Sequence, residues 1–220
     1  MAEAESTDYR ELIQKADELY KTRERQIYEL LVAHRDSSNP DILWRLERSA
    51  RKVARLADTS KEEKEKLTYE QLDISRKAVD LGPSNHSCHQ WCGISLNDVG
   101  DYEGKKTKIN DAYRIRDYFA KAVELKPESP RPHYLLGKWC FEVTAMPWVV
   151  RKAARVLFAT PPTSTFEEAL NCFDRAEKNA PDFSCENHPM LGKTHLKLGH
   201  KEEAKEWLTK VLKSDSNQPF

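Results

Sequence analysis

The sequence of 220 residues has few glycines, no long apolar segment and no net charge. Seven glycines are few for a β-rich or loop-rich enzyme, and the abundant Ala, Leu, Glu, Lys and Arg favour helices. No apolar run approaches the roughly 18 residues of a membrane span. The N-terminal sequence MAEAESTDYRE also lacks the basic end and apolar core of a signal peptide. We therefore expect a soluble, helical, cytoplasmic protein with no membrane span.

The charge balance excludes a strong global field. Lys plus Arg and Asp plus Glu both number 36, so we expect no nucleic-acid partner. Residues 101–155, however, contain twelve basic and seven acidic side chains. This imbalance predicts a local basic surface.

Five cysteines without a secretory signal indicate reduced thiols. The string NHSCHQWC raises the question of a metal site, because His86, Cys88, His89 and Cys92 share a helix face. We favour packing over metal binding, since no second cluster completes a zinc set and Cys92 occupies a position that suits a small apolar side chain. No cofactor is expected.

The sequence also lacks the motifs of common enzymes. It has no phosphate-binding glycine loop, no dinucleotide fingerprint and no HExxH. None of the cysteines is accompanied by a glycine-rich oxyanion turn. We expect a protein that is not an enzyme.

A repeat of helical hairpins organises the chain. Between residues 134 and 181, the spacing of Gly137, Ala169, Phe173, Ala176 and Pro181 matches a 34-residue tetratricopeptide repeat that is split by about twenty extra residues. The predicted fold class is therefore all-α, a tetratricopeptide-like helical-hairpin solenoid with insertions in the middle repeats. We expect repeats at about residues 41–84, 85–128, 129–182 and 183–216 within a repeat domain, residues 41–220.

Residues 1–40 predict an N-terminal helical pair, either a divergent repeat or a cap. Thr7 offers an N-cap for its first helix. In the next hairpin, Ser60 and Glu63 have the spacing of a capping box. The stretch GKKTKINDAY is an insertion near the turn of the following repeat.

Solenoids of this kind line a concave groove with their first helices. The usual groove positions form a basic and aromatic set, which suits an acidic peptide. The alternative interpretation is an ordinary solvated surface. The set consists of Gln90, Asn97, Arg131, Tyr134, Lys138, Phe141, Lys193 and Lys197.

Three strings carry a more specific resemblance: NDVGDYEGKKTKINDAYRIRDYFAKAVELKP, GKWCFEVTAMPWVVRKAARVLFATPPTSTFEEALNCFDRAEKNAPDF and LGKTHLKLG. From about Asp41 to about Lys213, the chain resembles the regulator of microtubule dynamics family. The resemblance implies association with microtubules and spindle poles, and support of chromosome segregation. Some relatives carry a membrane anchor and bind phospholipid; the missing anchor favours the cytosolic branch.

Both insertions supply basic side chains that would attract the acidic tails of tubulin. A helix beginning near Pro147 would bring its Trp and basic residues together, and would place Val149 and Val156 on an apolar stripe with Ala153 and Leu157, packed on the solenoid. The candidate residues are Lys105, Lys106, Lys108, Trp148, Arg151, Lys152 and Arg155.

A phospholipid-binding domain is the main alternative. In this interpretation the second insertion lines an apolar pocket in the groove, and Arg151 or Arg155 receives the phosphate. The apolar candidates are Trp148, Val149, Val150, Val156, Leu157 and Phe158.

Overall fold

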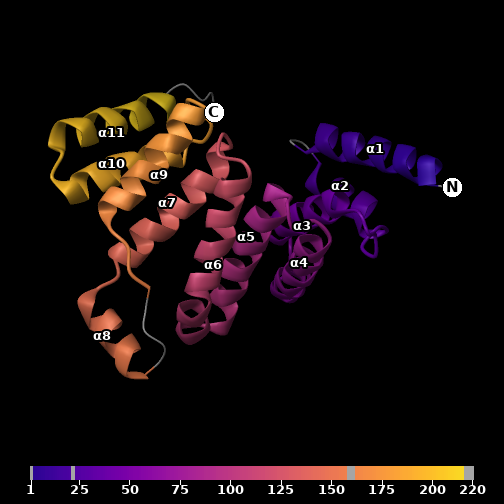
Figure 1. The fold of residues 1–220 in the computed structure, drawn as a ribbon, viewed down its shortest axis with the longest axis horizontal. Helices are drawn as coiled ribbons and strands as arrows, with labels where there is room; N and C mark the ends of the chain where they lie inside the picture. Colours follow the sequence, from indigo (N-terminus) through magenta and orange to yellow (C-terminus); the bar gives the residue numbers. More distant parts are fainter. Residues whose placement is uncertain (1, 21–22, 158–161, 216–220) are drawn as a thin grey trace. The chain divides into compact units, whose positions relative to one another are not determined.

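The computed structural model describes residues 2–20, 23–157 and 162–215, and these residues form helices with no strand (Figure 1). The all-α prediction is confirmed. The helices are α1 (Ala2–Leu19), α2 (Glu24–Val32), α3 (Pro40–Ala54), α4 (Lys61–Leu81), α5 (His86–Glu103), α6 (Lys105–Leu125), α7 (Pro130–Thr144), α8 (Trp148–Leu157), α9 (Phe166–Asn179), α10 (Asn187–Leu198) and α11 (Lys201–Asp215).

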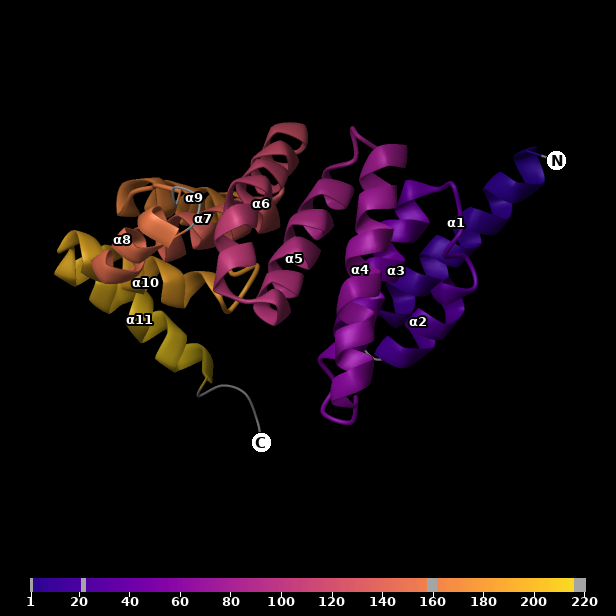
Figure 2. The ribbon, with the colours of Figure 1, turned by 90° about the horizontal axis from the view of Figure 1, so that it is seen from below.

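The chain divides into two compact units, residues 1–111 and 112–220, and the division falls within α6. In the first unit, α3 and α4 form a hairpin (Figure 2) and α5 packs on both. Helices α1 and α2 share its core, because Ala16, Ile27 and Leu31 are buried in one cluster with Leu43 and Leu46. The predicted helical pair is present, whereas a domain boundary near residue 40 stays a prediction.

Polar contacts supplement this core. Asp17 on α1 accepts hydrogen bonds from Arg45 at 2.7 Å and from Arg48 at 3.1 Å on α3. Burial alone would raise the pKa of Asp17, but the two guanidinium groups outweigh it and hold the pKa below its usual value. The ion pairs therefore help to attach α1 to α3.

In the second unit, α7 and α9 form one hairpin and α10 and α11 form another. A Cβ atom placed on Gly137 would lie 2.9 Å from the Phe173 ring, so only glycine permits this approach of α7 to α9. Ala169, Phe173 and Ala176 are all fully buried at the hairpin. These are the repeat positions that the sequence predicts.

Two local predictions need correction. Helix α1 begins at Ala2, so Thr7 lies inside the helix and is not its N-cap. Ser60 does accept a hydrogen bond from the Glu63 amide at 3.1 Å, but the Glu63 carboxylate pairs with Arg25 and leaves the capping box half made. The stretch GKKTKINDAY lies at the turn between α5 and α6: Gly104 is the C-cap of α5, and residues 105–113 form the first turns of α6.

Candidate functional site

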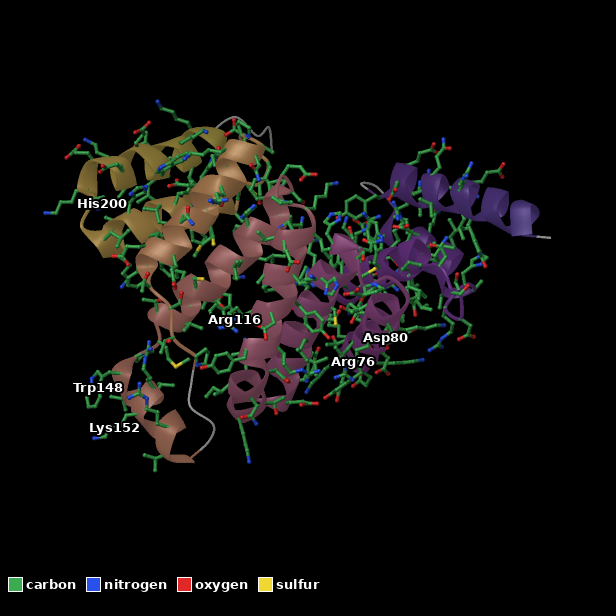
Figure 3. The ribbon with its side chains drawn as sticks, in the orientation of Figure 1. Arg76, Asp80, Arg116, Trp148, Lys152 and His200 are labelled. Carbon is green, nitrogen blue, oxygen red and sulfur yellow. The ribbon has the colours of Figure 1, made fainter. Side chains whose placement is uncertain are left out.

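The second insertion forms α8, a ten-residue helix with three basic and no acidic residues. Pro147 immediately precedes its first residue, and the Pro147 carbonyl accepts a hydrogen bond from the Arg151 amide at 3.0 Å. Trp148 and Lys152 lie on the same side of α8 and point away from the ribbon of α7 and α9 (Figure 3). The predicted helix is therefore present, with a basic side chain next to a large aromatic one.

The apolar side chains of α8 that the structure describes are exposed, contrary to the prediction that this helix packs an apolar face on the solenoid. The exposed fractions are 72% for Trp148, 57% for Val149, 37% for Val150 and 77% for Val156. The side chains of Ala153 and Leu157, and all of Phe158, lie outside the described residues. Helix α8 lies beyond the ends of α7 and α9 and away from α10 and α11 (Figure 1).

Arg151 attaches α8 to the preceding helix. Its Nη2 atom donates hydrogen bonds to the Val143 carbonyl at 2.8 Å and the Thr144 carbonyl at 3.4 Å. These carbonyls end α7, where the helix dipole favours a cation. Arg151 is half-buried, whereas Lys152 and Arg155 are exposed. The basic residues of the insertion therefore divide into one anchor and two surface charges.

The first insertion belongs to the other unit. Lys106 is exposed on α6, and Lys108 forms an ion pair with Asp101. The side chain of Lys105 lies outside the described residues. Because Asp101 neutralises Lys108, the described part of this stretch is less basic than its sequence suggests.

The predicted groove residues of α7 differ in exposure. Arg131 and Lys138 are exposed, but Tyr134 is only 7% exposed and packs between Phe173 and Phe183. Burial and the nearby Glu186 raise the pKa of Tyr134. Tyr134 therefore contributes to the core and offers little surface to a partner.

The remaining groove candidates are also mixed. Phe141 is half-buried and packs on the Phe166 ring, with 5.3 Å between centroids. Lys193 and Lys197 are exposed on α10. In the first unit Gln90 is buried and Asn97 half-buried. Lys and Arg side chains thus supply the exposed part of the set, and a groove that unites all eight positions stays a prediction.

Three potential metal ligands converge in the second unit. Glu177, Asp182 and His188 bring one ligand atom each within 4.8 Å of one another. The Lys210 ammonium lies 2.7 Å from the Asp182 carboxylate and 3.6 Å from that of Glu177. Since a built-in cation already balances these carboxylates, we interpret the cluster as an ion-pair network that connects α9, α10 and α11.

The cluster of His and Cys residues in α5 is used for packing. Cys88 and Cys92 are buried, and burial raises the pKa of the Cys88 thiol to about 12. The Nε2 atom of His89 makes a 2.7 Å hydrogen bond with the Pro83 carbonyl. Among the described residues, no three potential ligands converge here.

A polar cleft between α3, α4 and α5 was missed by the sequence analysis. It has a volume of about 160 Å³, and Arg51, Arg55, Gln71 and Asp98 are part of its wall. Arg51 donates a 2.5 Å hydrogen bond to Asp98, 47 residues later in the chain. Periodicity within single helices gives no signal for such a cleft.

Within the part of the chain that the structure describes, no helix has the length and apolarity needed to cross a bilayer.

Comparisons with known proteins agree on fold and family. A thermophilic TPR protein of Thermus thermophilus has a TM-score of 0.62 at 14% identity, with 95% of this chain and 92% of that chain covered. MamA of Desulfovibrio magneticus has a TM-score of 0.54 at 17% identity, with 97% of both chains covered. At such identities the likeness shows the fold alone. The tetratricopeptide-like solenoid prediction is confirmed.

Sequence relatives are more specific. Regulator of microtubule dynamics protein 1 of Bos taurus is 46% identical to this chain, over 96% of this chain and 67% of the relative. The Homo sapiens protein of the same name is 48% identical, over 76% of this chain and 54% of the relative. Regulator of microtubule dynamics protein 3 of Xenopus laevis is 34% identical over 90% and 43%. The chain thus spans about two thirds or less of these relatives. The family model described as "Regulator of microtubule dynamics protein 1-3" matches residues 12–219, and the chain belongs to this family.

Proposed function

We propose that the protein is a non-enzymatic, microtubule-associated scaffold that supports spindle function and chromosome segregation. Its expected locations are the cytoplasm, the cytoskeleton, the spindle and the spindle poles. Family membership supports the link to microtubules, and the solenoid fold supports a scaffold role. The observation that carries the proposed contact is α8, which combines exposed Lys152 and Arg155 with a complete lack of acidic residues.

The proposed partner surface is the acidic tail of tubulin. Exposed cations attract such a tail over about 8 Å at physiological ionic strength. Lys106 on α6 and Lys138 on α7 are further candidates. Because Arg151 is hydrogen-bonded to the end of α7, its role in the proposal is to position α8 rather than to contact tubulin.

Charge reversal tests this contact. We expect the double variant Lys152→Glu, Arg155→Glu to weaken co-sedimentation with microtubules by roughly tenfold or more, because attraction becomes repulsion. The matched control is Lys201→Glu, Lys205→Glu, with the same charge change on exposed positions of α11. If both double variants pellet like the parent protein while circular dichroism shows an intact fold, the proposal is wrong.

A phospholipid surface is the second candidate, and the exposed apolar residues of α8 favour it. A helix with Trp and Val on its surface and cations beside them can lie in the headgroup region of an anionic bilayer. Trp148→Ser, Val156→Ser should then abolish flotation with phosphatidylserine vesicles and leave microtubule binding intact. The opposite pattern would favour tubulin: the double variant Lys152→Glu, Arg155→Glu would then lose microtubule binding but still float with the vesicles.

The third candidate, an adaptor for acidic peptides, relies on α7 and α10. Arg131, Lys138, Lys193 and Lys197 are its exposed cations. Reversal of Lys193 and Lys197 to Glu should weaken binding of a fluorescent Glu-rich peptide under this interpretation. Such a variant leaves α8 unaltered and therefore distinguishes the groove from the insertion.

A further inference from the structure

The polar cleft between α3, α4 and α5 has hydrogen-bond acceptors on its α4 side. Thr68 and Gln71 lie one helical turn apart in its wall, and they are only 5% and 1% exposed. The Gln71 Oε1 atom has no hydrogen-bond partner among the described residues. The Thr68 hydroxyl donates its hydrogen to the Lys64 carbonyl at 2.7 Å, so it can only accept from a ligand. The α4 side of the cleft therefore suits a ligand that donates hydrogen bonds.

The unpaired Gln71 oxygen is a strong reason to expect such a ligand. A buried amide oxygen without a hydrogen bond destabilises the folded protein, and a donor that reaches it removes this cost. The terminal amide torsion of glutamine is broad. A small rotation of the Gln71 amide therefore turns Oε1 toward the cleft.

The α3 side of the cleft supplies donors. Arg51 donates to the Asp98 carboxylate of α5 from Nε at 2.5 Å and from Nη2 at 3.4 Å. A guanidinium group has five N–H donors, so most of those of Arg51 are left over. Arg55 is joined to the same carboxylate by one ion pair of 3.5 Å, and its side chain is 62% exposed. Both guanidinium groups can therefore bind a further anionic group.

The charges around the cleft favour a ligand with a single negative charge. The two arginines are balanced by only one acid, Asp98, because the other acid of the wall, Asp101, forms an ion pair with Lys108. Desolvation raises the pKa of buried Glu47, one helical turn before Arg51, and so favours its neutral form. One positive charge is thus in excess. It attracts a monoanion and repels an ammonium group.

We propose that this cleft binds a short hydroxycarboxylate. Its volume of about 160 Å³ equals that of about five water molecules of about 30 Å³ each, which suits a molecule of the size of lactate. The carboxylate would pair with Arg51 and Arg55, and the hydroxyl would donate to Gln71 Oε1. All lining residues belong to the first unit, residues 1–111. The site shares no residue with α8 and does not depend on the proposed microtubule contact.

Nuclear magnetic resonance titration of the unaltered protein with sodium lactate tests the inference. We expect saturable shifts of backbone amide signals from the cleft residues. Propionate lacks only the hydroxyl group and should bind at least about tenfold more weakly, because the Gln71 oxygen stays unpaired. Sodium chloride at the same ionic strength is the control. Tighter binding of glycine or of inorganic phosphate than of lactate would contradict the assigned ligand class, and no saturable shift with lactate would show that the cleft binds water only.

Variants test the assigned contacts. Arg55→Gln should weaken lactate binding at least about tenfold. Arg76→Gln is the matched control, because Arg76 is exposed on α4 and is not part of the cleft wall. Gln71→Leu should remove the preference for lactate over propionate. Melting temperatures measured before titration show whether each variant is folded. Equal lactate affinity of folded Arg55→Gln and Arg76→Gln would refute the proposal even if Gln71→Leu does not fold.

Discussion

Replacing Gly137 tests the close packing of α7 on α9. A methyl group at this position would approach the Phe173 ring to 2.9 Å and Cys172 Cβ to 3.0 Å, below ordinary van der Waals contact. Phe173 is fully buried, so its ring has little room to retreat. Overpacking costs about 1–3 kcal/mol, whereas Ala stabilises a helix by about 1 kcal/mol relative to Gly. We expect Gly137→Ala to lower the free energy of unfolding by about 0–2 kcal/mol, and Gly137→Leu to lower it by at least about 3 kcal/mol.

Gly100 supplies a matched control. It also lies inside a helix, but a Cβ atom there would meet Lys108 Cγ at 3.5 Å, an ordinary contact. Gly100→Ala should therefore show the helix preference alone and stabilise the protein by up to about 1 kcal/mol. The free energies of unfolding of Gly137→Ala and Gly100→Ala should therefore differ by about 1–3 kcal/mol. Each kcal/mol shifts the melting temperature of a chain of this size by about 2–4 °C.

Thermal and urea denaturation followed by circular dichroism measures the contrast. A double variant identifies its cause, because Phe173→Leu removes ring atoms and should reduce the cost of Gly137→Ala if the Phe173 ring is the obstacle. If Gly137→Ala stabilises the protein as much as Gly100→Ala does, the proposed close approach of α7 and α9 is absent.

The remaining perturbations concern polar contacts. Arg151→Ala should lower stability by about 1 kcal/mol and increase proteolysis within residues 145–163, whereas Lys152→Ala should do neither. Burial raises the pKa of Glu177, but hydrogen bonds, chiefly from His188, outweigh it, so the net pKa is lowered. The ionised Glu177 carboxylate therefore contributes fully to the free energy of unfolding above its ordinary pKa, and this contribution is lost as the pH falls through the lowered pKa. In acid denaturation, the Glu177→Gln variant should lose less stability than the parent protein over this pH range. Added Zn²⁺ should leave the melting temperature unchanged because Lys210 balances the cluster; a clear rise would indicate metal binding.

The sequence was informative where periodicity determines structure. The repeat positions Gly137, Ala169, Phe173 and Ala176 predict a hairpin, and the structure has it. The pattern [ST]-x-x-[DE] also identifies the N-terminus of α9, where Thr165 and Glu168 form a complete capping box. The sequence TSTFEEAL contains this signal.

Contacts between helices could not be predicted in the same way. The amphipathic pattern of α8 indicates a helix, but not whether its apolar side faces protein or solvent. Arg151 resembles any basic residue of the insertion until its hydrogen bonds to the end of α7 are known. The contact between the Tyr134 and Phe173 rings likewise depends on the crossing of α7 and α9, which helical periodicity alone does not specify.

Glu47 is a buried acid whose replacement should reveal its protonation state. It is fully buried on α3, accepts a 2.5 Å hydrogen bond from Ser95, and its Oε2 atom has no hydrogen-bond partner among the described residues. Desolvation raises its pKa well above the ordinary value of 4.5, although Ser95 and Arg51 oppose the shift. The folded state therefore binds this proton more tightly than the unfolded chain does.

The sign of the pH effect follows from this difference. As the pH rises from about 4.5 toward the raised pKa, the unfolded chain releases the proton first, and stability falls by up to about 1.4 kcal/mol per pH unit. Glu47→Gln keeps an acceptor for Ser95 and does not titrate. We expect the melting temperature of the variant to exceed that of the parent by an amount that grows as the pH rises above about 4.5 and disappears in more acidic solution. A difference that stays constant over this range would show that Glu47 has the same proton affinity in the folded and unfolded states, and would contradict the raised pKa that its desolvation implies.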